Sequence, residues 1–396
     1  MQARAAFFAW LRPHSSAILN APEYGGTGPP IKAWGPRRRL RGPPARDKMN
    51  ALEMSKKTTF RFAVIGLLTA VFLFFFLRSV DWREVVRYLS AIDIRWAGIA
   101  LLVSPVHLFT RGYRWKYLVH HEKRDVRFRS LWSANAVGFT VTYIFPGRLG
   151  ELAKPLFLAR REGIRPGFAI GTAVVERIFD ILTMCFFLGV FLMARPFFES
   201  RLSVSAEGYS RLYLWGAVGV IFALILLVVI LLFYFCRDRA LEVSAKFLRF
   251  LRPLRREKVL GLLREFIDGL RIFHNIGDFV LYILLGFVVW LSIMATYWVY
   301  LFTFRFPVPF YALFPYIFLT AVGASIPTPG MVGGFDSFSK LGLVAFMAMD
   351  PNQAVGFTLV VHALQLVVNC LIGYTILWKE GMSMLQLKAL GKQVGR

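Results

Sequence analysis

The chain has 396 residues, 57% of them hydrophobic, and its mean hydropathy is +0.54. These values exclude an ordinary soluble domain and predict an all-α polytopic membrane protein. A net charge of +25 would suggest nucleic acid as the partner of a soluble protein. Here the basic residues fall mostly between apolar segments, where they orient the chain and attract anionic headgroups. We therefore expect a membrane surface, and no nucleic acid, as the partner.

Residues 1–57 contain seven prolines and four arginines between positions 37 and 41, without a periodic apolar pattern. Such a segment cannot build a core, so we expect a disordered extension. Met49 and Met54 lie just before the first apolar segment, and a translation start later than Met1 is also expected.

Eight apolar segments follow, within a membrane domain predicted over residues 58–380, and residues 381–396 form a tail. Six are long enough to cross a membrane as helices: 58–78, 94–112, 167–194, 212–236, 279–304 and 353–378. The other two, 131–147 and 308–349, are interrupted by proline and glycine. The topology depends on these two.

Lysine and arginine counts sort the connecting segments by side. Segments 111–129, 147–165, 237–276 and the tail after Trp378 carry seven, five, ten and four basic residues, whereas 79–94, 196–210 and 305–309 carry two, one and one. Basic segments stay in the cytoplasm, so both termini are expected there, in the inner (plasma) membrane.

Both flanks of 131–147 then lie inside, and both flanks of 308–349 lie outside. We therefore expect about six spanning helices and two oppositely oriented re-entrant helical hairpins, an arrangement typical of an inverted repeat. The alternative is that both interrupted segments are kinked spanning helices, which leaves the termini on the same side.

Segment 237–276 places leucine and phenylalanine at helical spacing among basic residues. It predicts one or two amphipathic helices on the inner membrane surface, or equally a small cytoplasmic helical hairpin.

The stretch FPGRLGELAKP, residues 145–155, brings charge into the first interrupted segment. A helix that begins after the Pro-Gly pair would offer free backbone amides to an anion. Arg148 is suited to hold a phosphate, Glu151 to orient Arg148, and Lys154 to add positive charge. The alternative is a helix end whose arginine reaches the membrane interface.

Three ionisable residues, Glu176, Arg177 and Asp180, lie well inside the segment 167–194. Helical spacing puts Thr172, Glu176 and Asp180 on one face. Charges at this depth are costly unless they are paired or face water, so they indicate a functional site. The competing interpretation is an internal ion pair, Glu176 with Arg148 or Arg177 with Asp180, that only fixes helix packing.

The stretch SIPTPGMVGGFD, residues 325–336, cannot continue a helix. Non-helical backbone at membrane depth is tolerated where it lines a cavity or is buried in protein, so we expect a substrate-contacting turn; the alternative is a plain interfacial loop. The residues expected at this site are Pro327, Thr328, Gly330, Gly333, Gly334 and the lone acid Asp336.

Two weaker patterns have structural interpretations. His362, Gln365 and Asn369 share a helix face and are expected to hydrogen-bond between helices. RGYRW, residues 111–115, is typical of an interfacial arginine and aromatic anchor. The sequence has no phosphate-binding loop, paired-histidine metal motif or nucleophile elbow, and Cys185, Cys236 and Cys370 lie in or beside apolar runs. No cofactor, no metal and no enzymatic activity are therefore expected.

The motifs RGYRW, FPGRLGELAKP with LARREGI, VVERIFD and SIPTPGMVGGFD follow one another in this order. Together they resemble the membrane domain of lysylphosphatidylglycerol synthases and its stand-alone flippase-like relatives, over roughly residues 58–380. Met331 stands where that family often has a second glycine, and Asp336 where it usually has glutamate. The resemblance implies movement of a phospholipid or lipid-linked headgroup between leaflets.

The leading prediction is a lipid flippase or scramblase in which a polar groove between the two hairpins shields an anionic headgroup. Arg148 would contact the phosphate, and the turn from Pro327 to Gly334 would form the outer gate. One alternative is a non-transporting partner of a lipid-modifying or glycosyl-transferring enzyme, docked through residues 237–276. Another is a translocator of a polyprenyl-phosphate-linked sugar. The oligomeric state is not predicted.

Overall fold

The computed structural model describes residues 63–193 apart from 79, 121 and 146, single positions between 214 and 232, and residues 236–250, 253–269 and 276–381. In these ranges the regular structure is helical, without a strand, as predicted. All of them belong to the unit Lys56–Arg396. The predicted extension 1–57, most of the predicted span 212–236 and nearly all of the tail lie outside the described residues.

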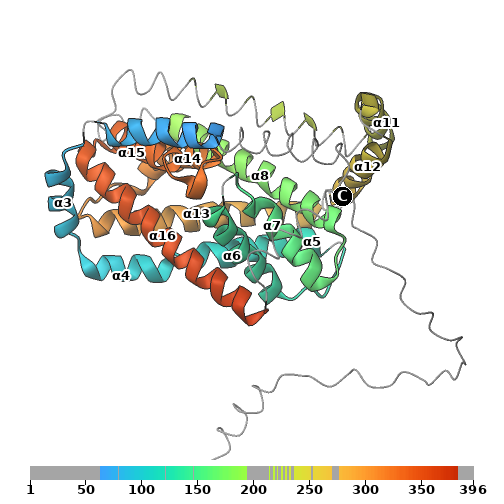
Figure 1. Ribbon diagram of the computed structural model, residues 1–396, viewed down its shortest axis with the longest axis horizontal. Coiled ribbons are helices and arrows are strands. Elements are labelled where there is room, and N and C mark those ends of the chain that lie inside the picture. Colours follow the sequence, from blue (N-terminus) through green and yellow to red (C-terminus); the bar gives the residue numbers. More distant parts are fainter. Residues whose placement is uncertain are drawn as a thin grey trace, which may run out of the picture. The chain divides into compact units, whose positions relative to one another are not determined.

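After a helix at Ala63–Leu77, the chain forms twelve labelled α-helices among the described residues (Figure 1). They are α3 (Trp82–Ser90), α4 (Ile94–Val103), α5 (Val106–Val119), α6 (Phe128–Ile144), α7 (Gly150–Glu162), α8 (Pro166–Met193), α11 (Arg237–Phe247), α12 (Pro253–Gly269), α13 (Ile276–Thr303), α14 (Leu313–Ser325), α15 (Gly334–Met347) and α16 (Pro351–Lys379). Short 3₁₀ turns lie at Leu248–Phe250, Phe310–Ala312 and Pro329–Met331, the last labelled η4.

Segment 308–349 forms two packed helices, as a hairpin requires, but segment 131–147 is mostly one helix, α6, and its packing partner α7 lies in the basic segment 147–165 that was expected to flank it. The first hairpin consists of α6 and α7, and the second of α14 and α15. Both rely on a glycine at the start of the returning helix. A Cβ on Gly150 would overlap the carbonyl of Gly138, and one on Gly334 would come within 2.7 Å of the carbonyl of Gly323. The backbones of each pair can therefore approach only because side chains are absent.

The helices around the two hairpins correspond in their contacts. Helix α6 of the first hairpin lies against α16, which follows the second hairpin, and α14 of the second lies against α8, which follows the first (Figure 1). In addition α7 packs on α8, and α15 packs on α16. Each half of the chain thus supplies a long helix that lies against the hairpin of the other half.

The segments that the charge count grouped together also meet in the structure. Lys123, before the first hairpin, donates to the Glu162 carboxylate at its far end over 3.1 Å, and Arg161 pairs with Glu380 over 2.8 Å. Gln353, after the second hairpin, donates to the carbonyl of Phe304 before it. Each hairpin therefore begins and ends in the same region.

In the part of the chain that the structure describes, two helices, Gly277–Thr303 and Pro351–Lys379, are long and apolar enough to cross a membrane. Four large apolar residues of α13 are exposed along one face: Val280, Leu284, Val288 and Leu291. An uncovered apolar stripe of this kind is expected to face lipid. Helix α8 has the same length as α13 but carries Glu176, Arg177 and Asp180.

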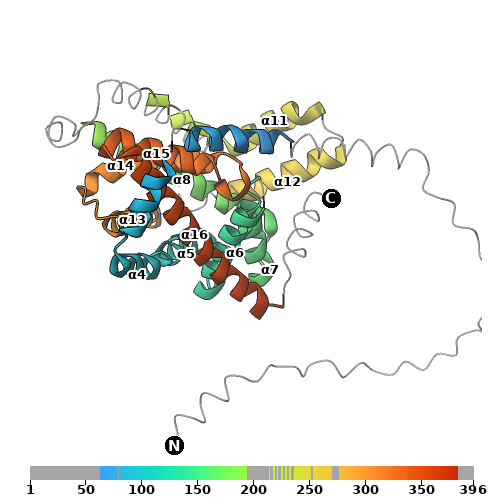
Figure 2. The ribbon, with the colours of Figure 1, turned by 60° about the vertical axis from the view of Figure 1, so that its left-hand side comes forward.

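Two sequence expectations are refined. The predicted span 94–112 is two helices, α4 and α5, which break at Ser104 and Pro105, because proline removes a backbone donor. Segment 237–276 contains two helices, α11 and α12, that contact each other (Figure 2). Helix α12 also packs on α8 and buries Ile267.

Candidate functional site

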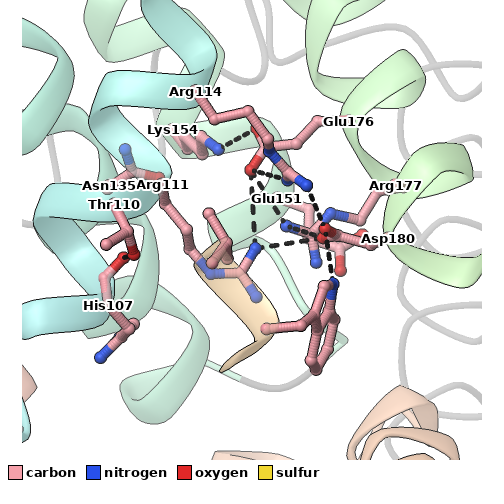
Figure 3. A network of polar contacts seen from close by, with 12 residues as sticks. His107, Thr110, Arg111, Arg114, Asn135, Glu151, Lys154, Glu176, Arg177 and Asp180 are labelled. Carbon is pink, nitrogen blue, oxygen red and sulfur yellow. Dashed lines mark hydrogen bonds and ion pairs between the residues drawn. The ribbon is translucent and has the colours of Figure 1, made fainter. Parts of the chain in front are cut away.

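Helices α5, α7 and α8 bring ionisable side chains together in a buried cluster (Figure 3). Asp180 of α8 lies 2.7 Å from a terminal nitrogen of Arg114 and 3.1 Å from one of Arg111. Arg177 approaches the same carboxylate over 3.2 Å. The indole of Trp290 donates to Oδ1 of Asp180, also over 3.1 Å. Asp180 therefore holds three guanidinium groups in one place.

Glu176, one helical turn earlier, completes the cluster. It accepts from Arg114 over 3.1 Å and pairs with Lys154 of α7, and its side chain is completely buried. The Lys154 ammonium also lies 4.3 Å from the centre of the Trp115 ring, an attractive cation–π contact. The predicted face of Thr172, Glu176 and Asp180 is confirmed, because all three side chains point into the protein interior.

The cluster carries more positive than negative charge. Among the described residues, four basic groups, Arg111, Arg114, Lys154 and Arg177, face the two carboxylates of Glu176 and Asp180. Two positive charges are thus not neutralised within it. Arg177 is 39% exposed, but the other three basic groups are buried, and uncompensated buried charge is unfavourable, so this excess favours an anion beside the cluster.

Arg111 and Arg114 were not predicted as site residues. RGYRW was interpreted as an interfacial anchor, and this is wrong for both guanidinium groups, which are buried at 5% and 0% exposure and paired with α8. The available signal was their spacing of three, which places both arginines on one helix face. Their partners, more than 60 residues away, could not be found by local pattern.

Arg148 and Glu151 form the predicted pair, at 3.0 Å. Arg148 itself lies before the helix, with a left-handed backbone at φ 54°, rather than in its first turn. The amides of Glu151 and Leu152 donate to the carbonyls of Arg148 and Leu149. These amides already have acceptors, so the predicted anion site depends on the Arg148 side chain instead.

A cavity of about 390 Å³ lies between the two hairpins. The first hairpin and its loop contribute Tyr143, Arg148 and Glu151, and the second contributes Thr320, Ser325, Met331 and Phe335. Arg111, Arg177 and Asp180 of the charge cluster line the same space. The Nε atoms of Arg111 and Arg148 are buried without a hydrogen-bond partner within the described protein.

A second cavity, of about 170 Å³, lies on the other side of Arg148. Arg148, Glu151 and Arg177 line both cavities, and Lys154 lines the smaller one. The three shared charged side chains therefore stand where the two spaces meet.

The turn of the second hairpin is buried rather than exposed as an interfacial loop would be. Thr328, Gly330, Gly333 and Gly334 are buried, while Pro327 is exposed. Gly330 and Gly333 have φ of 59° and 83°, which glycine adopts without strain. A Cβ on Gly330 would lie 3.1 Å from the carbonyl of Tyr143. The turn therefore packs directly on α6 of the first hairpin.

Asp336 caps this turn and joins it to α16. One carboxylate oxygen accepts from the Gly333 amide over 2.8 Å, and the other lies 2.7 Å from Nδ1 of His362. Nε2 of His362 lies 2.8 Å from the Gly330 carbonyl. Asp336 does not reach the α8 cluster, so the predicted site residues divide into two groups.

The polar face of α16 forms the interhelical hydrogen bonds that its sequence predicts. Gln365 accepts from the Tyr143 hydroxyl and donates to that of Tyr297, and the carbonyl of Asn369 accepts from Thr140. Helix α16 thus binds α6 and the turn of the second hairpin together. In the described ranges no group of three or more His, Cys, Asp or Glu side chains is arranged to hold a metal ion.

A family model described as the lysylphosphatidylglycerol synthase TM region matches residues 60–373. The matched range contains both hairpins, the α8 cluster and α16. The comparison with curated proteins gave no match.

Proposed function

Because the chain belongs to the family of the lysylphosphatidylglycerol synthase TM region, a membrane family related to lipids, we propose that it moves an anionic lipid headgroup between leaflets. The protein acts as a translocator, without enzymatic chemistry. Its partner is a membrane phospholipid or a lipid-linked phosphate.

One observation supports this most: the cavity between the hairpins adjoins a cluster with two unneutralised positive charges. A phosphate cannot enter hydrocarbon without a large desolvation penalty. Arginine replaces part of its hydration with forked, charge-assisted hydrogen bonds. Arg111, Arg148 and Arg177 line the cavity and can supply such contacts, and the cavity volume of about 390 Å³ lies in the range of about 300–1,000 Å³ that is typical of ligand pockets.

The two adjoining cavities suggest a route for the headgroup. Among the described residues, Arg148 and Glu151, at their junction, form an ion pair only with each other, and their side chains are 26% and 42% exposed. In our proposal Arg148 exchanges Glu151 for the phosphate as it passes from one cavity to the other. The buried carboxylates, Glu176 and Asp180, keep the remaining cations in place.

We propose further that both hairpins are re-entrant, of opposite orientation, in an inner-membrane protein with both termini in the cytoplasm. Helices α7, α14 and α15 have 13, 13 and 14 residues. At about 1.5 Å per residue each extends about 20 Å, short of the roughly 30 Å hydrocarbon layer. The paired ends of each hairpin, with the basic flanks of the first, support the same arrangement.

Translocation of a fluorescent phosphatidylglycerol in proteoliposomes tests the proposal. Arg148→Ala and Glu176→Gln should each slow transport at least about tenfold, because each removes a charge-assisted hydrogen-bonding group. Arg87→Ala is the matched control, since Arg87 forms an exposed pair with Glu84 away from the cavities. Equal translocation rates in the native protein and in all three variants would refute the assignment of this site. Competition by an added polyprenyl phosphate separates the two kinds of cargo.

A further inference from the structure

His362 is a buried histidine whose two ring nitrogens both face acceptors. Nε2 lies 2.8 Å from the Gly330 carbonyl, which can only accept a hydrogen bond. Nδ1 lies 2.7 Å from an oxygen of Asp336. A neutral imidazole has one N–H, so with an ionised Asp336 it can satisfy only one of these contacts.

The arrangement therefore needs one additional proton. Either the imidazole is protonated and donates on both sides, or Asp336 is protonated and donates to Nδ1. In both cases the pair is electrically neutral overall, which suits a site where His362 and Asp336 are 8% and 3% exposed. Without that proton, the pair carries one negative charge, and one ring nitrogen of His362 faces an acceptor oxygen with no hydrogen between them.

The surroundings offer no other compensating charge. Asp336 and His362 form an ion pair only with each other among the described residues. The ring of Tyr143, on α6, has its centre 6.1 Å from that of His362, while Tyr297 of α13 and Tyr316 of α14 bond to Gln365 and Ser339. Lys340, on α15, donates instead to the carbonyl of Phe76. A proton is thus the cation that fits this site.

We infer that Asp336 and His362 form a proton-binding site that latches the turn of the second hairpin. The proton ties Gly330 to α16 through His362, while Asp336 holds Gly333. When the proton is lost to water, His362 can no longer hydrogen-bond to both Asp336 and the Gly330 carbonyl. The turn then loses one of its hydrogen bonds to α16. Met331 and Phe335, next to these contacts, line the large cavity, so release of the turn alters its wall.

This inference goes beyond the proposed function, because the latch concerns the mobility of the turn whatever the cavity binds. Thr328 is a suitable reporter of that mobility. Its side chain is buried at 1% exposure, and its hydroxyl has no hydrogen-bond partner in the described protein. Thr328→Cys therefore removes no hydrogen bond, and the thiol reacts only when the turn opens.

The test measures alkylation of Thr328→Cys in full-length protein whose Cys185, Cys236 and Cys370 have been replaced. The control is Ser325→Cys, at the exposed end of α14, whose rate corrects for thiol ionisation. The ratio of the two rates should rise with pH in protein with His362. The variant His362→Gln keeps one donor but cannot carry the proton. In this variant the ratio of the two rates should be about fivefold higher than in protein with His362 near neutral pH, and it should be independent of pH.

A ratio that is constant with pH in the protein with native His362 overturns the latch, as does an equal rise in His362→Gln. If His362→Gln does not fold, the pH dependence of the ratio in protein with native His362 is sufficient to test the latch. If the labelling ratio behaves as expected but the native protein transports no lipid in proteoliposomes, the result counts against the proposed function alone, because labelling of the turn does not depend on cargo.

Discussion

The α8 cluster contains more basic groups than its two carboxylates can neutralise, and this excess is what favours the proposed binding site over an ion pair that only fixes packing. A purely structural ion pair needs one cation for each carboxylate, whereas Glu176 and Asp180 face four basic groups. Replacing a buried ion pair with apolar side chains often stabilises a protein, so packing gives no reason for the excess. The carboxylates instead position guanidinium groups beside the cavity.

Asp180→Asn should destabilise the protein strongly. The change leaves three guanidinium groups without their shared carboxylate, and breaking a buried pair in this way costs about 3–5 kcal/mol. Thermal unfolding in detergent measures the loss. The matched control is Glu84→Gln, which breaks an exposed pair and should change stability by less than about 1 kcal/mol. Similar shifts in the two variants would contradict the role given to Asp180.

Sequence patterns revealed this site only where its geometry is local. Helical spacing found the face of Glu176 and Asp180, and a separation of three found Arg148 with Glu151. The pairing of Arg111 with Asp180 depends on α5 packing beside α8, which no spacing within one helix contains. For the same reason Asp336 and His362 were each noticed as polar residues, but not as partners.

At the scale of elements, the hairpins are defined by glycines more than by their prolines. Gly150 and Gly334, each the first residue of a returning helix, lie against the backbone of the preceding helix. The sequence indicated where the apolar segments break, because proline and glycine end helices. It did not indicate how closely the two arms approach, since that depends on tertiary packing.

Gly150→Ala should open the first hairpin. The new methyl group would overlap the Gly138 carbonyl and the Thr142 side chain, so backbone must move. We expect a loss of several kcal/mol, as for severe overpacking, measured by thermal unfolding. Gly98→Ala in α4 is the control, because a Cβ there meets nothing within 4 Å, and alanine in a helix gains about 0.5–1 kcal/mol. A neutral Gly150→Ala would show that the close approach is not required.

At the scale of the whole molecule, charge counting grouped the segments that meet in the structure. Lys123 and Glu162 join two basic segments, and Gln353 and Phe304 join the two ends of the spans that flank the second hairpin. This succeeds because lysine and arginine are excluded from the hydrocarbon and therefore mark its borders. The break between α4 and α5 was missed, although Pro105 stands there, because the apolar composition continues across it.

The proposed orientation can be tested by labelling single cysteines from each side of the membrane. Asp125→Cys and Arg160→Cys, at the two ends of the first hairpin, should react only with reagent on the cytoplasmic side. Pro307→Cys and Pro351→Cys, at the two ends of the second, should react only from outside. All four residues are exposed. Labelling of the two ends of one hairpin from opposite sides would mean that it spans the membrane.

The most direct measurement of the central claim is the identity of the lipid held between the hairpins. Protein purified from mixed micelles of phosphatidylglycerol and phosphatidylcholine can be analysed by native mass spectrometry. The cationic cavity should retain phosphatidylglycerol preferentially, and Arg148→Gln should reduce this preference while Arg87→Gln preserves it. Equal retention of both lipids, or a preference unchanged in Arg148→Gln, would contradict an anionic headgroup site at this cavity.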